Sequence, residues 1–309
     1  MNAPDKDQTL LGVAAALVAF SLWGVFPLYF KAVSHLPPFE VLAHRIVWTV
    51  FFVGIIIIAR GRWNRVQAVF ADRKLLLTLL VSSLLVSTNW LVFIWAVAND
   101  MVLESSLGYF INPLVNVALG MVFLKERLRL WQWIAVGLSV VAVGNLIGQH
   151  GAIPWVALTV AISFGLYGLV RKVAVVDAYT GIFVETTLIM PPVLAYLVYV
   201  GFEGTGAFDI TDVKLTGLLM MAGLMTATPL VLFALAAKRL RLSTLGFFQY
   251  IAPTGHFVLA VFLYNEDFTD AHKITFGMIW FALAIYSFDS IIAHRRQRVL
   301  IRQHQRNTK

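Results

Sequence analysis

The chain has 309 residues, of which 60% are hydrophobic and 13% are charged, and its mean hydropathy is +0.81. Soluble domains are about 45–50% apolar, so this composition excludes a water-soluble globular protein. The absence of cysteine excludes a disulfide framework and a thiolate metal site. We attribute the net charge of +8 to cytoplasmic loops of a membrane protein rather than to nucleic-acid binding.

The expected elements are membrane-spanning helices. The first apolar run, 10–30, has about the 20 residues needed to cross a bilayer, and the segment before it carries acids rather than a basic region, so we expect a first span and not a cleaved signal. Backbone groups cannot remain unpaired in lipid, which predicts an all-α fold. Ten such runs follow one another: 10–30, 40–59, 75–98, 103–124, 131–148, 153–170, 180–200, 216–237, 245–264 and 274–293. Pro113, Pro191, Pro229 and Pro253 lie inside spans and are expected to kink them.

Lysine and arginine predict the orientation. With a cytoplasmic N-terminus, the outer loops hold Lys31, Lys214 and Lys273, Arg45 lies in a span, and the other 20 of the 24 basic residues are inside. The positive-inside rule therefore predicts that both termini are cytoplasmic. We expect the segment 60–74 to be either a plain loop or an interfacial helix with Trp63, Val66 and Phe70 on one face. The basic tail 294–309 is expected to anchor the topology, with binding to anionic lipid as the alternative.

The chain contains an internal repeat. SLGYFINPLVNVALGMVFLKERL (106–128) aligns with TLGFFQYIAPTGHFVLAVFLYNEDF (244–268), pairing Pro113 with Pro253 and Glu126 with Glu266. The repeat implies two five-helix halves, 10–148 and 152–293. Because five is an odd number of spans, the second half must be inverted, and inverted repeats are typical of secondary transporters that bind substrate near the midplane.

The same segments resemble a known family. GVAAALVAFSLWGVFPLYFK, FEVLAHRIVWT, the FINPL region and LGFFQYIAPT are similar to the RarD subgroup of EamA-domain proteins in the drug/metabolite transporter superfamily. The similarity extends from residue 10 to 292. It implies a bacterial inner-membrane permease with ten helices in two EamA repeats, cytoplasmic termini and export of small metabolites or drugs. It does not imply a particular substrate.

Ionisable residues inside spans are candidates for function because each costs about 2.5–3.5 kcal/mol to insert. Glu40 and His44 share a helical face near the outer end of the second span, and Arg45 is one step round the helix. One interpretation is a substrate-anion or proton-coupling site. The alternative is that Arg45 snorkels outward and pairs with Glu40.

Two polar stripes, one in each half, are expected to face each other across a central site. Tyr109, Asn112 and Asn116 form the first stripe, and Gln249, Tyr250 and His256 form the second. The alternative is that the amides serve as interhelical hydrogen bonds. Asn89 and Trp90 in the third span are expected either to line the same cavity or to pack in the core.

The remaining carboxylates in or near the spans are weaker candidates for a role in transport. Glu185 is a weak candidate for a proton relay, whereas Asp289 is expected to be solvated near the cytoplasmic end. Glu126 and Glu266 end spans at opposite faces and are expected to form salt bridges as structural or gating elements.

The sequence therefore predicts a secondary-active permease that works by alternating access. We expect a small-molecule substrate and membrane lipids as partners, with protons as an open choice of coupling ion, and no cofactor or metal. Oligomeric state stays open. A membrane-embedded enzyme and a passive channel are the alternatives, but the chain has no HExxH, GxSxG or P-loop motif, and its seven histidines have no ligand spacing.

Overall fold

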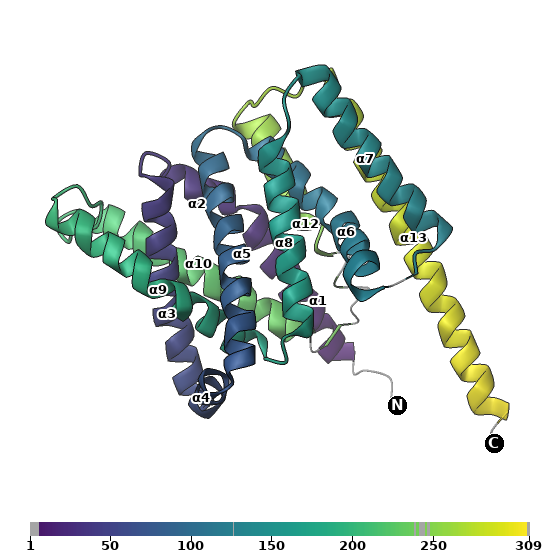
Figure 1. The fold of residues 1–309 in the computed structure, drawn as a ribbon, viewed down its shortest axis with the longest axis horizontal. Coiled ribbons are helices and arrows are strands. Elements are labelled where there is room, and N and C mark those ends of the chain that lie inside the picture. Colours follow the sequence, from purple (N-terminus) through teal and green to yellow (C-terminus); the bar gives the residue numbers. More distant parts are fainter. Residues whose placement is uncertain (1–5, 126, 238, 241–244, 246–247, 308–309) are drawn as a thin grey trace.

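The computed structural model describes residues 6–307 except 126, 238, 241–244 and 246–247, and every regular element in that part is a helix (Figure 1). The first elements are α1 (Lys6–Gly24), α2 (Phe26–Ala32), α3 (Pro38–Ala59), α4 (Trp63–Ala71), α5 (Arg73–Ala98), α6 (Val102–Leu124) and α7 (Leu130–His150). They are followed by α8 (Trp155–Val173), α9 (Ala178–Phe202), α10 (Val213–Ala237), α12 (Ile251–Val258), the π-helix η1 (Leu259–Leu263) and α13 (Asp270–Asn307).

Nine helical stretches in the described part are long and apolar enough to cross a membrane. The first of them, Gln8–Ala32, includes both α1 and α2. The expected ninth span, 245–264, is represented by a shorter apolar helix over Ile251–Leu263. Many large apolar side chains on the outside of the bundle are exposed, as expected where lipid replaces water. The chain is thus a multi-pass membrane protein of about ten helices.

The first span is not one continuous helix, in contrast to the expectation for 10–30. α1 ends at Gly24, and α2 begins at Phe26 with Pro27 in its first turn, where the missing N–H of proline is tolerated. At the break the backbones of α1 and α12 come so close that a Cβ on Gly255 would lie 2.8 Å from the carbonyl oxygen of Gly24. The new direction of α2 buries Phe26 and Phe30 inside the bundle.

Helix α3 contacts helices from parts of the chain that lie far apart in the sequence. α3 packs against α5, α9 and α10, while α7 runs along α13 at one side of the bundle (Figure 1). α6 packs on α8 and α12 packs on α1; similarly, α5 contacts α8 and α10 contacts α1. Side chains on different faces of α3 therefore reach different neighbours.

The segment 60–74 contains a helix, α4, rather than a plain loop. Val66 and Val69 are buried, and α4 contacts α5 and α9. Trp63 lies 5.9 Å from Phe183 between ring centroids but stays 45% exposed, and Phe70 is 42% exposed. Of the three residues expected to share one face, Trp63, Val66 and Phe70, only Val66 is therefore buried.

At the other end of the chain, α13 continues through the basic tail to Asn307. The side chains of that tail, and Glu126, lie outside the described residues. Their predicted roles stay predictions.

Candidate functional site

Arg45 is buried in the middle of the bundle, with 4% of its surface exposed. Its guanidinium carbon lies 4.1 Å from the ring centroid of Trp90, 5.5 Å from that of Phe30 and 5.7 Å from that of Phe26. Its Nε donates a hydrogen bond to the hydroxyl of Thr226 at 3.0 Å. Helices α2, α3, α5 and α10 therefore meet around one cation.

This cation forms no ion pair with a carboxylate in the described part of the chain, so the expected Arg45–Glu40 pair is not formed. Burying an unpaired charge is expensive, and aromatic faces return only about 0.5–2 kcal/mol each. Of the three guanidinium nitrogens of Arg45, only Nε forms a hydrogen bond to a residue in the described part of the chain. The planar guanidinium group can donate two parallel hydrogen bonds to a carboxylate or phosphate, and such a group would supply the missing counter-charge.

An aromatic cluster extends from Arg45 toward the second half of the chain. Phe93 lies 5.7 Å from Phe30 between ring centroids, stacks on His256 at 5.1 Å and lies 5.9 Å from Tyr109. Tyr109 and His256 are themselves 5.7 Å apart. Tyr109 of the first predicted polar stripe and His256 of the second are therefore in contact, next to the rings that surround Arg45. We call Phe26, Phe30, Trp90, Phe93, Tyr109 and His256 the central aromatic cluster.

His256 is fixed in this cluster by one ring nitrogen. Its Nε2 lies 2.9 Å from the carbonyl oxygen of Trp23, at the end of α1. Its other ring nitrogen, Nδ1, is buried without a hydrogen-bond partner. Such an orphan nitrogen is uncommon and marks a place where a ligand or water can bind.

Two of the three asparagines link neighbouring helices. Asn89 donates to the carbonyl of Val160 at 3.0 Å and to the hydroxyl of Ser163 at 3.1 Å, both on α8. Asn112 donates to the carbonyl of Ala161 at 3.0 Å, and Asn116 donates to Asn112. Asn112 therefore links α6 to α8, as the interhelical alternative expects, whereas the hydrogen bond of Asn116 lies within α6. Asn89 also accepts a hydrogen bond from the Tyr109 hydroxyl at 3.0 Å, so it positions a member of the central aromatic cluster.

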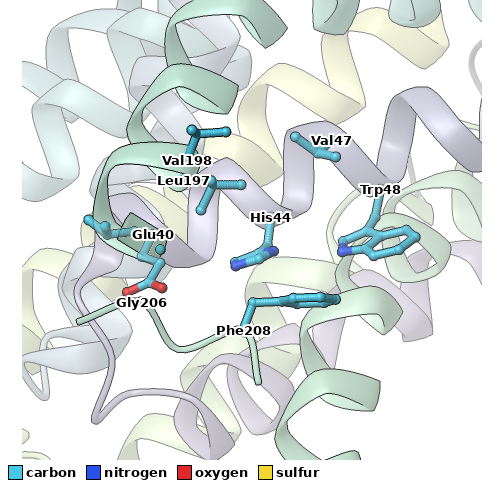
Figure 2. A pocket seen from close by; sticks show the side chains of 10 residues that line it. Glu40, His44, Val47, Trp48, Leu197, Val198, Gly206 and Phe208 are labelled. Carbon is cyan, nitrogen blue, oxygen red and sulfur yellow. The ribbon is translucent and has the colours of Figure 1, made fainter. Parts of the chain in front are cut away.

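Glu40 and His44 face away from Arg45 and line a cavity of about 270 Å³ beside α9 (Figure 2). The Glu40 carboxylate accepts a hydrogen bond from the N–H of Ala207 at 2.6 Å, and the His44 ring stacks on Phe208 with 5.5 Å between centroids. A step of one residue turns a helix by about 100°, which explains why Arg45 points elsewhere. The structure thus divides the trio predicted as one site.

The rest of the second stripe lies apart from the central aromatic cluster. Tyr250 lines a different cavity, of about 480 Å³, between the α1–α2 break and α12. Gln249 precedes α12, and its backbone N–H donates to the carbonyl of Leu245. Of the second stripe, His256 is the residue that joins the central aromatic cluster.

Sequence reasoning missed several members of this site. Phe26 and Phe30 are four residues apart on α2, and Phe93 is three residues from Trp90 on α5, so each pair shares a helical face that could have been noticed. Thr226 offers no such signal, since threonine is common in membrane helices and its bond to Arg45 depends on how α10 packs.

A second buried charge lies between α5, α8 and α9. The Glu185 carboxylate is 1% exposed, accepts a hydrogen bond from Ser82 at 2.5 Å and one from Tyr167 at 3.4 Å, and lies 3.6 Å from a guanidinium nitrogen of Arg171. Unlike Arg45, this group has an internal counter-charge.

The carboxylates near helix ends are also paired. Both oxygens of Glu266 accept backbone hydrogen bonds at the start of α6, from Val102 at 2.8 Å and from Leu103 at 2.7 Å. Glu266 therefore caps α6, and it forms no salt bridge of the expected kind with another described residue. Asp289 is not solvated as expected, because it is 8% exposed and forms an ion pair with Arg129 at 2.6 Å. Among the described residues, no group of three or more histidines or carboxylates is arranged to hold a metal ion.

Comparison with known proteins gives the family. Residues 10–147 match the profile of the EamA-like transporter family. The chain is 45% identical over 290 residues to an uncharacterized transporter of Vibrio cholerae serotype O1, a match that covers 94% of this chain and 96% of that protein. It is 44% identical over 292 residues to Protein RarD of Escherichia coli strain K12, covering 94% and 99%. A solved crystal structure that is 19% identical has the same fold with a TM-score of 0.56, covering 90% of this chain and 96% of that one. The chain therefore belongs to the RarD group of the EamA-like transporters, in the drug/metabolite transporter superfamily.

Proposed function

We propose that this transporter is a secondary-active permease that exports small molecules bearing an anionic group, and that the substrate binds beside Arg45. The buried guanidinium without a carboxylate partner is the observation that carries the proposal. Ionisable residues inside membrane proteins mark substrate or ion pathways by default, and this one lacks an internal counter-charge.

The rings around Arg45 indicate the rest of the substrate. Trp90, Phe26 and Phe30 offer flat apolar faces next to the guanidinium, and Phe93 extends them toward Tyr109 and His256. Ligand sites combine such walls with a few polar groups that set orientation. A substrate that fits has a carboxylate or phosphate bound to Arg45 and an apolar or aromatic body that lies along the central aromatic cluster.

Alternating access would follow from two inverted halves, 10–148 and 152–293. The boundaries of the family match, 10–147, support the first half. The contacts support a two-fold relation: α6 on α8 corresponds to α12 on α1, and α5 on α8 corresponds to α10 on α1. Arg45 and Tyr109 come from the first half, and Thr226 and His256 from the second. A rocking movement between halves would therefore open the site to one side at a time.

We infer that both termini are cytoplasmic and that the chain resides in a bacterial inner membrane. The excess of lysine and arginine in the loops and tail on the side of the N-terminus supports this orientation. Arg45 would then lie about 10 Å from the outer end of α3, given 1.5 Å per residue. That depth agrees with a site that either side could reach.

Metabolite measurements test the function even while the substrate is unidentified. Cells that lack the protein and cells that overproduce it should differ in a small set of anionic compounds, with more outside the overproducing cells. Inside-out vesicles from the overproducing cells should then accumulate the same compounds. No difference in any compound, or a difference restricted to cations, would contradict the proposal. An enzyme would instead change the total amount of a compound rather than its distribution.

A further inference from the structure

The cavity beside Glu40 and His44 is separate from the surroundings of Arg45 and has its own chemistry. It has a volume of about 270 Å³, close to the lower limit of about 300 Å³ for small-molecule pockets. α3 and α9 form two walls, and the segment that joins α9 to α10 closes the third through Phe208 (Figure 2). No member of the central aromatic cluster lines this cavity.

Two buried nitrogen atoms on this face of α3 have no hydrogen-bond partner. They are Nε2 of His44, which is 4% exposed as a residue, and Nε1 of Trp48. The two residues are one helical turn apart, and Figure 2 shows both rings beside Phe208. Buried polar groups in folded proteins are nearly always satisfied, so a missing partner is expected in the cavity. The indole N–H can only donate, which requires an acceptor atom from that partner.

The charge of the cavity comes from Glu40. This carboxylate is 2% exposed, and one oxygen accepts the N–H of Ala207. It forms no ion pair with a lysine or arginine in the described chain. Glu40 is therefore a buried carboxylate that shares its cavity with the aromatic rings of His44 and Phe208, whereas Arg45 is a buried guanidinium among aromatic rings.

We propose that this cavity binds a small amine with an apolar body and an oxygen acceptor. The ammonium group pairs with Glu40 and contacts the Phe208 ring, as organic cations do in aromatic sites. The oxygen accepts the N–H of Trp48, and the apolar body lies along Leu197 and Val198. These contacts satisfy the unpaired carboxylate and the orphan indole nitrogen together.

The cavity opens at the surface of the bundle that faces lipid. Val198 is 49% exposed and Phe208 is 43% exposed, so an amine could enter from the membrane as well as from water. A free amine and the ethanolamine head of a phospholipid present the same ammonium group and nearby oxygen. The site is independent of the proposed transport of anions, because Glu40, His44 and Trp48 lie on a different face of α3 from Arg45.

Calorimetric titration of the purified full-length protein in detergent tests the site with three matched probes. 2-Phenoxyethylamine carries the ammonium group, 2-phenoxyethanol is neutral and phenoxyacetate is anionic. We expect the amine to bind at least about tenfold more tightly than the other two, since hydrogen bonds to charged groups are markedly stronger than neutral ones. Glu40→Gln, which keeps an acceptor for Ala207, should weaken amine binding by about tenfold. Asp267→Asn, which removes an exposed carboxylate outside both sites, is the control and should bind like the wild type.

A second variant tests the oxygen contact even if Glu40→Gln fails to fold. Trp48→Phe keeps an aromatic ring but removes the N–H. It should weaken 2-phenoxyethylamine relative to 3-phenylpropylamine, which has a methylene in place of the oxygen. Equal binding of amine, alcohol and acid, or an unchanged ratio between the two amines in Trp48→Phe, would overturn the proposal.

Nanodiscs distinguish the two sources of the ammonium group. If phospholipid occupies the site, nanodiscs with phosphatidylethanolamine should lower the apparent affinity for 2-phenoxyethylamine relative to pure phosphatidylcholine. Equal affinity in both assigns the site to free amines. A higher affinity in phosphatidylethanolamine would contradict recognition of an ammonium group.

Discussion

At the scale of single residues, two opposite charges are buried on adjacent faces of one helix. Arg45 lies against Trp90, whereas Glu40 holds the backbone of Ala207. The sequence alone predicts that each needs a partner in the membrane. It cannot say which partner, because Thr226 and Ala207 are more than 160 positions away along the chain. Only the packing of α3 against α9 and α10 decides that.

The Tyr109 hydroxyl gives a prediction at this scale. Tyr109→Phe keeps the ring against Phe93 and His256 but leaves Asn89 Oδ1 without its donor. The loss of one buried hydrogen bond should lower the free energy of unfolding by about 0.5–1.5 kcal/mol. Thermal unfolding in detergent measures it. The comparison is Phe164→Leu on α8, which removes a ring 6.0 Å from that of Tyr109 between centroids but no hydrogen bond. An unchanged Tyr109→Phe protein would show that Asn89 finds another donor.

At the scale of helices, hydrophobic runs predict where spans occur better than how they begin and end. The run 10–30 is apolar enough to be predicted as one span, although Gly24 and Pro27 flank the break at Val25 and could have indicated it; the close approach of Gly24 and Gly255 lies at the same place. The sequence does not decide between a loop and helix α4, because the burial of α4 depends on α5 and α9. The cap of α6 by Glu266 could not be predicted, since it joins residues 164 positions apart.

Removal of that cap should destabilise the N-terminal end of α6. Glu266→Ala leaves the N–H groups of Val102 and Leu103 without acceptors, which should cost about 1–2 kcal/mol. Glu266→Gln retains one acceptor oxygen and should cost less. Hydrogen exchange of the two amides in both variants measures the effect. Equal protection in wild type and Glu266→Ala would contradict the cap.

The same carboxyl predicts a dependence on pH. Burial raises the pKa of Glu266, although the N–H groups of Leu103 and Val102 act in the opposite direction. The folded protein therefore holds this proton more tightly than the unfolded chain does. The resulting stabilisation is complete below the unfolded pKa and is lost as the pH rises through the folded pKa. Melting curves over that range should fall less steeply with pH for Glu266→Gln than for the wild type; parallel curves would show that other groups dominate.

The ion pair of Glu185 and Arg171 links α9 to α8. Glu185→Leu leaves the partly buried Arg171 guanidinium without its counter-charge, which should destabilise the protein by at most about 3–5 kcal/mol. Replacing both residues with leucine should recover a substantial part of that loss, because no charge then remains unpaired. Melting temperatures of the single and double variants test the pairing. A double variant no more stable than Glu185→Leu would show that Arg171 has other compensation.

At the scale of the whole molecule, composition and the repeat predict most of the architecture. A chain with 60% hydrophobic residues in regular runs has few alternatives to a helical bundle in a membrane. The repeat predicts that two stripes meet, and Tyr109 and His256 do, whereas Gln249 and Tyr250 do not join the central aromatic cluster. Stripe spacing identifies a helical face only where the helix is continuous, and α12 begins at Ile251, after Gln249 and Tyr250.

Counterflow in proteoliposomes, with the compounds found by the metabolite comparison, tests most directly whether Arg45 recognises substrate. Arg45→Gln should reduce exchange of every anionic substrate by at least about tenfold, since it removes a charge-assisted interaction worth roughly 1.5–3 kcal/mol. Arg73→Gln, an exposed arginine at the start of α5, should exchange like the wild type. Unchanged exchange of all transported compounds in Arg45→Gln would contradict the central site.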